Sequence, residues 1–161
     1  ELTIGTFSKS FASIGGFVAG PEAVIHYLRH HARSLMFSAS MPPAAAATVL
    51  AALEIIEREP ERRERLWQIT HRMMDGFRSL GFEIGPTETP IIPIMVGPME
   101  KTFIFWRALF DCGVFTNPVM PPAVPENSCR LRTSYIATHT DDQLNCVLEN
   151  FEKVGKKLGV I

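Results

Sequence analysis

The sequence predicts an α+β fold, in which a small, mostly antiparallel sheet has helices packed on one of its faces. Beyond Gly81, segments of strand and helix character follow one another in the order strand, strand, helix, strand, strand, helix. That alternation suits a single sheet covered on one side. The long helical segments each carry one apolar stripe, so each has a single face to bury. We therefore expect an α+β arrangement in this part of the chain.

The composition of the chain excludes several classes of protein. Its 161 residues include 16 Lys+Arg and 17 Asp+Glu, a formal net charge of -1, so we expect no nucleic-acid partner. The longest charge-free stretch, residues 34–53, contains two prolines and several hydroxyls, so we expect no transmembrane segment. Cys112, Cys129 and Cys146 lie far apart and form no C-x-x-C pair. We therefore expect reduced thiols, no metal site and a cytoplasmic protein.

The first sixty residues begin with strand character and continue with helices. Leu2–Phe7 and Gly16–Ala19 are short strand candidates, joined by a connector rich in serine and glycine. The fixed φ of proline suits the first turn of a helix, which we expect over Pro21–Ala32. A second helix is expected over Ala44–Glu57 from the propensity of its many alanines. Its small side chains predict close packing against another surface.

Residues 60–81 predict a long amphipathic helix. Pro60 opens it, and Gly81 stands where a C-terminal cap belongs. Acidic and basic residues alternate between Glu57 and Arg65, so we interpret that charged run as a solvated face rather than a binding patch. Apolar residues recur along the helix at steps of three and four, namely Leu66, Ile69, Met73, Phe77 and Leu80.

The residues that follow complete the predicted sheet. Phe82–Ile84 and Ile91–Val96 are strand candidates, the second with a proline that indicates an edge or a bulge. We expect a helix over Lys101–Cys112 and then a short strand at Val114 and Phe115. A proline-rich loop over Asn117–Pro125 and a further strand over Arg130–Ile136 follow.

The last helix has the clearest start signal in the chain. Thr140 is followed three residues later by Gln143, which is the spacing of a capping box. Asp141 and Asp142 add negative charge at the positive end of the helix dipole. One apolar stripe then follows, formed by Leu144, Val147, Leu148, Phe151, Val154 and Leu158.

Lys9 is the only charged residue in the stretch 2–20, which is otherwise built from apolar, hydroxyl and glycine residues. Burial in such surroundings would disfavour the ammonium form and leave a neutral amine that can act as a nucleophile, as a Schiff-base lysine must. Hydroxyls at Thr6, Ser8 and Ser10 can donate to a phosphate without adding charge. An amine beside a phosphate cradle predicts pyridoxal 5'-phosphate (PLP) as cofactor.

Two other interpretations of this stretch compete. Lys9 could lie at a turn between two strands with its ammonium group in water, and that alternative stays open. A nucleotide-binding P-loop fails on spacing, because Ser8 and Ile4 stand where that motif requires glycine.

Five segments of the chain resemble the α-oxoamine synthases, which are PLP enzymes of fold type I, the aminotransferase class I/II fold. Members of this family join an amino acid to an acyl-CoA. The motifs occur in the order of the family and cover essentially the whole chain. They are Thr6–Gly20, Phe37–Pro43, Pro90–Ile94, Asn117–Pro125 with Arg130–Arg132, and Thr138–Thr140.

The resemblance implies roles for particular residues. Lys9 would be the Schiff-base lysine and the base that removes the α-proton of the substrate. Thr6 would hold the cofactor phosphate, and Ser38 or Ser40 would reach the phosphate of the cofactor in the partner subunit of a homodimer. Arg132 would bind the substrate carboxylate, which a guanidinium fork matches bidentately.

The resemblance also implies an activity. The amino-acid sequences of the motifs are most similar to those of family members that condense L-serine with an acyl-CoA and release CO2. The activities of 8-amino-7-oxononanoate synthase and 2-amino-3-ketobutyrate CoA ligase are the alternatives. Met120 and Ala123 stand where several relatives have Arg and Thr, so the amino-acid specificity stays open.

The resemblance further implies that this chain is the carboxy-terminal part of a subunit. In the family, the Asp that pairs with the pyridine nitrogen and the His that stacks on the ring lie upstream of the lysine. Residues 1–60 would be the end of the large PLP-binding domain, and residues 61–161 the small C-terminal domain. We expect this chain alone to be inactive. A competing hypothesis is that it serves by itself as a non-catalytic folding or dimerisation module.

Overall fold

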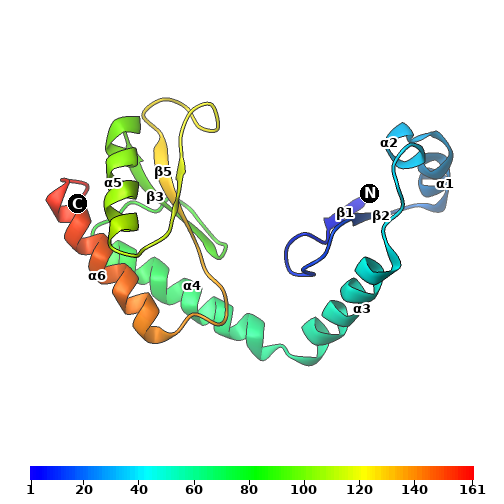
Figure 1. The fold of residues 1–161 in the computed structure, drawn as a ribbon, viewed down its shortest axis with the longest axis horizontal. Coiled ribbons are helices and arrows are strands. Elements are labelled where there is room, and N and C mark those ends of the chain that lie inside the picture. Colours follow the sequence, from blue (N-terminus) through cyan, green and yellow to red (C-terminus); the bar gives the residue numbers. More distant parts are fainter. The chain divides into compact units, whose positions relative to one another are not determined.

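The computed structural model describes all residues, 1–161, and divides them into two compact units, Glu1–Pro60 and Glu61–Ile161 (Figure 1). In chain order the elements are β1 (Thr3–Thr6), β2 (Gly16–Ala19), α1 (Glu22–His31), α2 (Arg33–Met36), α3 (Pro43–Arg58), α4 (Glu61–Ser79), β3 (Ile91–Gly97), α5 (Met99–Asp111), β4 (Asn117–Val119), β5 (Cys129–Ser134) and α6 (Asp141–Lys157). None of the helices combines the length and the apolar character that crossing a bilayer requires.

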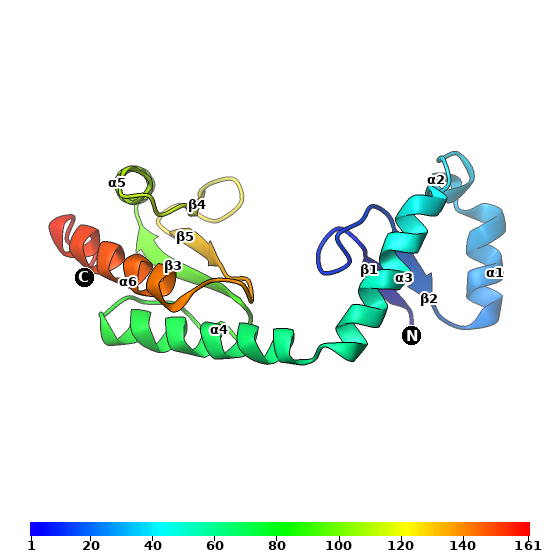
Figure 2. The same cartoon turned by 60° about the horizontal axis from the view of Figure 1, so that its bottom comes forward.

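The first unit is built around the antiparallel β1–β2 hairpin, whose connecting loop is drawn in dark blue in Figure 2. Its register pairs Thr3 with Ala19 and Thr6 with Gly16. Phe7 is the only buried side chain of this unit. Large apolar side chains such as Leu50 on α3 stay exposed. An exposed apolar surface of this kind is typical of a site where other protein binds.

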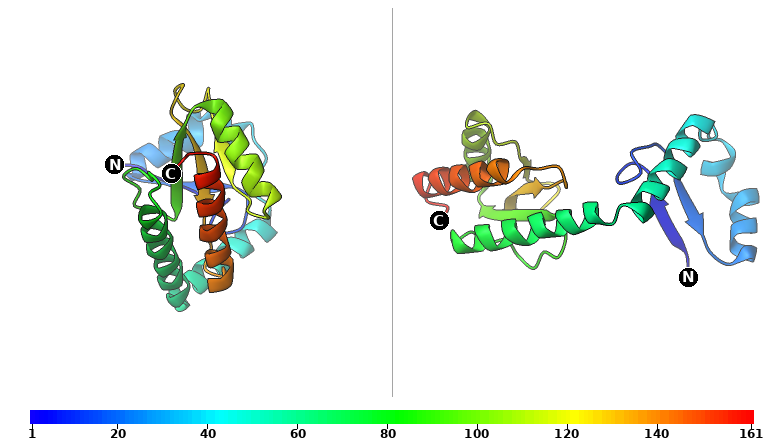
Figure 3. Two further views of the ribbon diagram at one scale, coloured as in Figure 1. Left: turned by 90° about the vertical axis from the view of Figure 1, so that its left-hand side faces the viewer. Right: turned by 90° about the horizontal axis from the view of Figure 1, so that it is seen from below.

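The second unit contains a three-stranded antiparallel sheet in the order β3-β5-β4. Its helix α6 lies between α4 and α5 (Figure 3). The sheet has one buried and one open face, because successive side chains of a strand point to opposite sides. The buried face of β5 carries Cys129, Leu131 and Thr133, while Arg130, Arg132 and Ser134 of the same strand are not buried.

The hydrophobic core of the second unit lies between the helices and the covered face of this sheet. At its centre the Phe151 ring of α6 meets Phe77 of α4 and Phe105 of α5, with ring centroids 4.9 and 5.5 Å apart. Ile92 and Ile94 of β3 are fully buried on the sheet side. An α+β unit with helices on one face of a small antiparallel sheet is confirmed.

The predicted strand over Phe82–Ile84 is wrong. It does not form, although Phe82 and Ile84 are buried and Glu83 between them is exposed. The segment makes a single backbone hydrogen bond to β3, from Met95 N to the Glu83 carbonyl at 2.9 Å. Gly81 and Gly85 on either side have φ of +94° and +63°, so the backbone turns away before a ladder can extend.

Two short elements were not expected from the sequence. The helix α2, Arg33–Met36, follows α1 after a single residue. The short strand expected at Val114 and Phe115 does not form, and the strand β4, Asn117–Val119, lies instead at the start of the predicted proline-rich loop and pairs with β5. It occupies the edge of the sheet, where a proline does not interrupt the hydrogen bonds of a central strand.

The predicted capping box of the last helix is confirmed. The Thr140 hydroxyl accepts from Gln143 N at 3.3 Å, and Thr140 N donates to Gln143 Oε1 at 3.0 Å. The next residue, Asp141, accepts from Arg65 and Arg72 of α4, each at 2.8 Å. These guanidinium groups, Arg65 foremost, hold the pKa of Asp141 below its usual value. The start of α6 is thereby tied to α4.

Candidate functional site

Lys9 lies in the loop that joins β1 to β2, between two short antiparallel strands. Backbone hydrogen bonds of 3.0 Å run from Phe7 N to the Gly15 carbonyl and from Ala12 N to the Lys9 carbonyl. The Ser13 hydroxyl donates to the Ala45 carbonyl at the start of α3, 3.1 Å away. The loop is therefore held to the hairpin and to α3.

Two of the predicted phosphate-binding hydroxyls lie together beside Lys9 in the sequence. The hydroxyl oxygens of Thr6 and Ser8 are 2.9 Å apart, and Ser8 N donates to Thr6 Oγ1 at 3.3 Å. Both residues are exposed, and the hairpin contains no acidic side chain between Thr3 and Ala19. Hydroxyl donors, one amine and no carboxylate fit a cofactor that carries a phosphate and an aldehyde.

Two glycines allow the close approaches within the hairpin. A Cβ atom at Gly16 would lie 2.5 Å from the Gly5 carbonyl oxygen, an approach that no side chain allows without a shift of the backbone. Gly15 has a φ of +96°, and a Cβ atom there would lie 2.7 Å from Met41 Sδ. The glycines of the motif thus hold the strands together and let Met41 pack on the loop.

Lys9 is exposed in the structure. The hypothesis of a neutral, nucleophilic amine required burial, and residues 1–161 do not bury this side chain. The local geometry is the one that the competing interpretation expected, a lysine at a turn between strands with its ammonium group accessible to water. Any environment that favours the neutral amine must therefore come from other protein or from the cofactor itself.

Ser38 and Ser40 lie in the segment between α2 and α3, and both are exposed. The Ser38 hydroxyl donates to the Ser34 carbonyl at 2.5 Å. Since a serine hydroxyl has one hydrogen to donate, Ser38 must break that bond before it can donate to a phosphate. The Ser40 hydroxyl makes no hydrogen bond within the chain, which makes it the freer donor of the two.

Arg132 stands on the open face of the sheet in the second unit and is exposed. Its Nη2 donates to Asn117 Oδ1 at 3.4 Å, and no acidic side chain forms an ion pair with it. An unneutralised guanidinium fork is suited to bind a carboxylate. Arg132 thus lies in the second unit, whereas Lys9 and the serines lie in the first.

The sequence predicts a proline-rich loop at Asn117 and, although the residue opens one of the motifs, assigns it no role of its own. The register of β4 with β5 sets it directly opposite Arg132, a pairing across fifteen residues that no local pattern encodes.

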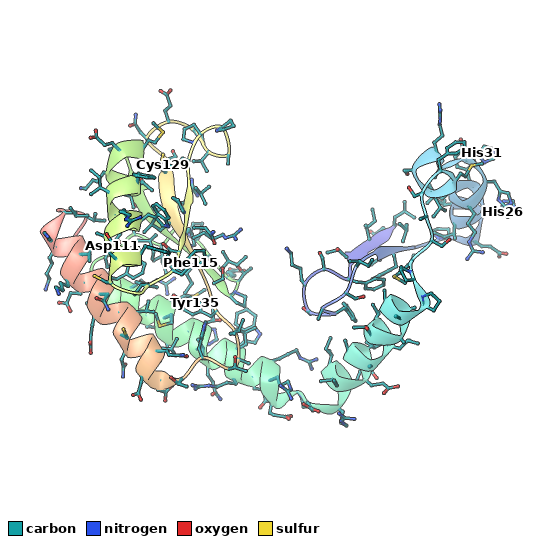
Figure 4. The ribbon with its side chains drawn as sticks, viewed as in Figure 1. His26, His31, Asp111, Phe115, Cys129 and Tyr135 are labelled. Atoms are coloured by element: carbon teal, nitrogen blue, oxygen red, sulfur yellow. The ribbon has the colours of Figure 1, made fainter.

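A cavity of about 330 Å³ lies at one end of the sheet in the second unit. Its lining includes Phe115, Tyr135 and His139, and Figure 4 labels Phe115 and Tyr135 there. The Tyr135 hydroxyl donates to Thr133 Oγ1 at 3.1 Å, and burial raises the pKa of this phenol above its usual value. Neither Lys9 nor Arg132 lines this cavity, so it is not the predicted substrate site.

Comparison with known proteins gives relatives over the whole chain. Residues 1–151 match the family "Aminotransferase class I and II". The chain is 50% identical over 161 residues to a serine palmitoyltransferase of Bacteroides ovatus and covers 41% of that protein. It is 40% identical over 161 residues to an 8-amino-7-oxononanoate synthase of Thermoanaerobacter pseudethanolicus, again covering 41% of it.

A solved structure has the same fold. A high-resolution structure of SPT, a serine palmitoyltransferase, with its PLP internal aldimine matches with a TM-score of 0.92 and 36% identity. The match covers 100% of this chain and 41% of that one. The chain thus spans about two fifths of the length of the relatives it matches.

Proposed function

The chain belongs to the aminotransferase class I and II family, and from this membership we propose that the full-length protein is a PLP-dependent α-oxoamine synthase that condenses L-serine with a long-chain acyl-CoA. A carbon–carbon bond forms between the α-carbon of serine and the acyl carbonyl carbon. The serine carboxyl group leaves as CO2, the thioester C–S bond breaks, and CoA leaves as the thiol. The observation that carries this proposal is the 50% identity to a serine palmitoyltransferase over every residue of the chain.

The hairpin residues supply the groups that hold the cofactor. Thr6 and Ser8 donate to its phosphate after exchanging the hydrogen bond between their hydroxyls, which lie 2.9 Å apart, and that of Thr6 to the Gly15 carbonyl for bonds to the phosphate. Lys9 supplies the amine that holds it covalently. When bound, PLP serves as the electron sink for the charge that develops on the α-carbon of the substrate.

Lys9 is also the group placed to move a proton. A neutral amine accepts the proton of the α-carbon, and an exposed ammonium group does not. Because Lys9 is exposed in residues 1–161, we assign its shielding from water to the rest of the full-length protein. This assignment agrees with the exposed apolar side chains that the first unit presents, such as Ile4 and Leu50.

Arg132 binds the carboxylate of the amino acid. Its guanidinium group carries no carboxylate partner within the chain and donates one hydrogen bond, to a neutral amide. The remaining N–H groups are free for a bidentate contact. Such a contact holds the substrate by the group that later departs as CO2.

The proposal extends to the domains and to the assembly. Residues 1–60 form the end of a larger PLP-binding domain, and residues 61–161 form the C-terminal domain. The protein is a cytoplasmic homodimer in which Ser40, or Ser38 after release of the Ser34 carbonyl, donates to the cofactor phosphate of the partner subunit. The free thiols of Cys112, Cys129 and Cys146 support a reducing compartment.

The amino acid used as substrate distinguishes this proposal from the alternative, an 8-amino-7-oxononanoate synthase activity. The 40% identity to an enzyme of that name supports the alternative less strongly. The test incubates the purified full-length protein with PLP, palmitoyl-CoA and L-serine, L-alanine or glycine in turn. Release of CoA thiol and CO2 and the ketone product are measured. We expect turnover with L-serine and little with the other two. Preference for alanine or glycine, or no release of CO2 with any of them, would overturn the proposal.

A further inference from the structure

The side chain of Asn117 is the only hydrogen-bond partner of the Arg132 guanidinium group within the chain, at 3.4 Å. The two residues are direct partners in the register of β4 and β5. Cross-strand partners project to the same face of a sheet and can touch. Asn117 therefore lies beside Arg132 on the open face, away from the helices.

The backbone of Asn117 is held from both sides. The Trp106 indole nitrogen on α5 donates to the carbonyl of Thr116, the preceding residue, at 3.0 Å. Pairing of Pro118 and Val119 with Leu131 and Arg130 fixes the residues that follow. An amide side chain on so restrained a backbone can keep a flexible guanidinium group in one orientation.

A neutral partner suits this task better than an acidic one. An aspartate at this position would pair with Arg132 and compete with the carboxylate of a ligand. An asparagine accepts one hydrogen bond and leaves the charge of the guanidinium group uncompensated. Since Arg has five N–H donors, four stay available for the ligand.

We propose that Asn117 is a positioning residue for the substrate carboxylate, acting through Arg132, and that this amide contributes to the preference for an amino acid over an amine. The proposal rests on the carboxylate-binding role assigned to Arg132 under the proposed function. Asn117 itself does not touch the substrate in this scheme. Its effect is to reduce the number of guanidinium orientations that a carboxylate must select among.

The first test measures ligand binding rather than turnover. The full-length holoenzyme is titrated with L-serine and with ethanolamine, which has the amine and hydroxyl of serine but no carboxylate, while the cofactor absorbance is followed. Asn117→Ala should weaken serine binding by about threefold to tenfold, the range of one net hydrogen bond, and leave ethanolamine binding unchanged. In steady state, KM for serine should rise by a similar factor while kcat changes by less than about twofold.

A second variant separates positioning from a purely structural role. Asn117→Asp keeps the shape of the side chain. If the amide only stabilises the fold, the aspartate should weaken serine binding less than alanine does. If the amide positions Arg132, the aspartate should weaken serine binding more than alanine does, because it neutralises the guanidinium group. Asn150→Ala, which removes a half-buried amide from α6, is the matched control and should leave serine binding unchanged.

Arg132→Gln distinguishes failure of this inference from failure of the assignment beneath it. If Arg132→Gln weakens serine binding and Asn117→Ala does not, the role of Asn117 is overturned and that of Arg132 stands. If Arg132→Gln leaves the discrimination between serine and ethanolamine intact, both are overturned. Support requires that Asn117→Ala causes no further loss when Arg132 is already replaced.

Discussion

At the scale of single residues, the hairpin offers a compact set of donors without a competing acid. Thr6 is placed at the end of β1 by its pairing with Gly16, and its hydroxyl lies 2.9 Å from that of Ser8. These contacts leave the pair exposed and accessible to a phosphate. The chemistry of the site therefore depends on a few small side chains whose loss should be measurable one at a time.

Replacement of Thr6 by valine tests the phosphate contact. Thr6→Val keeps the shape of the side chain and removes its hydroxyl, so PLP should bind the full-length protein about tenfold more weakly or worse, as expected for loss of a hydrogen bond to a charged group. Affinity is measured by titration of the apoprotein with PLP. Thr48→Val on α3 removes a hydroxyl that bonds only to the Ala44 carbonyl and should change nothing. Equal affinities for both variants would contradict the assignment of Thr6.

Local sequence predicted some of these residues and not others. Thr6 and Lys9 lie three positions apart in one motif, so their proximity follows from their closeness in the sequence. Asn117 is different, because it meets Arg132 only through the register of β4 with β5. The sequence leaves both a buried and an exposed Lys9 open, because burial depends on everything that packs around a side chain and not on the neutrality of its neighbours in sequence.

At the scale of elements, close contacts join the two strands of the hairpin in the first unit and two helices in the second. In the hairpin, the strands approach so closely at Gly16 that an added Cβ atom would lie 2.5 Å from a backbone oxygen. In the second unit, α6 is tied to α4 by Asp141 and two arginines. The contact at Gly16 and the ion pairs of Asp141 can each be tested by a substitution.

Gly16→Ala should shift the hairpin and with it Thr6, the residue opposite. The cost should be about 1–3 kcal/mol, as for other overpacked contacts, and PLP affinity should fall with it. Gly20→Ala is the control, because its Cβ atom would meet mainly the flexible, half-exposed Leu2 side chain. Measurement is by thermal unfolding and PLP titration of the full-length variants. If Gly16→Ala behaves like Gly20→Ala, the close approach in the hairpin is not a constraint.

Asp141→Asn should lower the Tm of the protein at neutral pH and have little effect in strong acid. The pKa of Asp141 is lower in the folded state, chiefly through the hydrogen bond from Arg65. Its stabilisation is therefore present above the unfolded pKa of about 3.9 and is lost as the pH falls through the folded value. The Tm difference between wild type and variant should shrink over that acidic range and also at high salt. A difference that is independent of pH would contradict the ion-pair account.

Whether an element or contact can be predicted from the sequence depends on how far apart in the chain the residues that form it lie. The capping box at Thr140 needs only four residues, and the sequence was sufficient to place it. Phe82–Ile84 has the alternating burial of a strand but lies between Gly81 and Gly85, both at positive φ, so alternation alone was misleading. The link between Arg65 and Asp141 joins residues 76 positions apart, beyond the reach of any pattern in the sequence.

At the scale of the whole molecule, the two units differ in how completely they bury their apolar side chains. All the buried residues of the hydrophobic core lie between Ile69 and Val154 in the second unit. The first unit buries Phe7 alone. A unit with its own core can unfold cooperatively by itself, whereas one without a core depends on other protein.

Residues 61–161 expressed alone should therefore fold, and residues 1–60 should not. Thermal unfolding, monitored by circular dichroism, should show a single cooperative transition for residues 61–161 and a gradual loss of signal for residues 1–60. The intact chain, residues 1–161, should show no turnover of serine and acyl-CoA, because Lys9 is exposed in it. A cooperative transition for residues 1–60, or activity of the intact chain, would contradict this view of the two units.

The central claim is that Lys9 holds the PLP cofactor in the full-length protein, and chemical trapping tests it most directly. The holoenzyme is reduced with borohydride, which makes the bond between an amine and the cofactor permanent, and the digested protein is mapped by mass spectrometry. The account predicts a reduced PLP adduct on Lys9 and none in Lys9→Ala. An adduct on a different lysine, or no adduct at all, would contradict it.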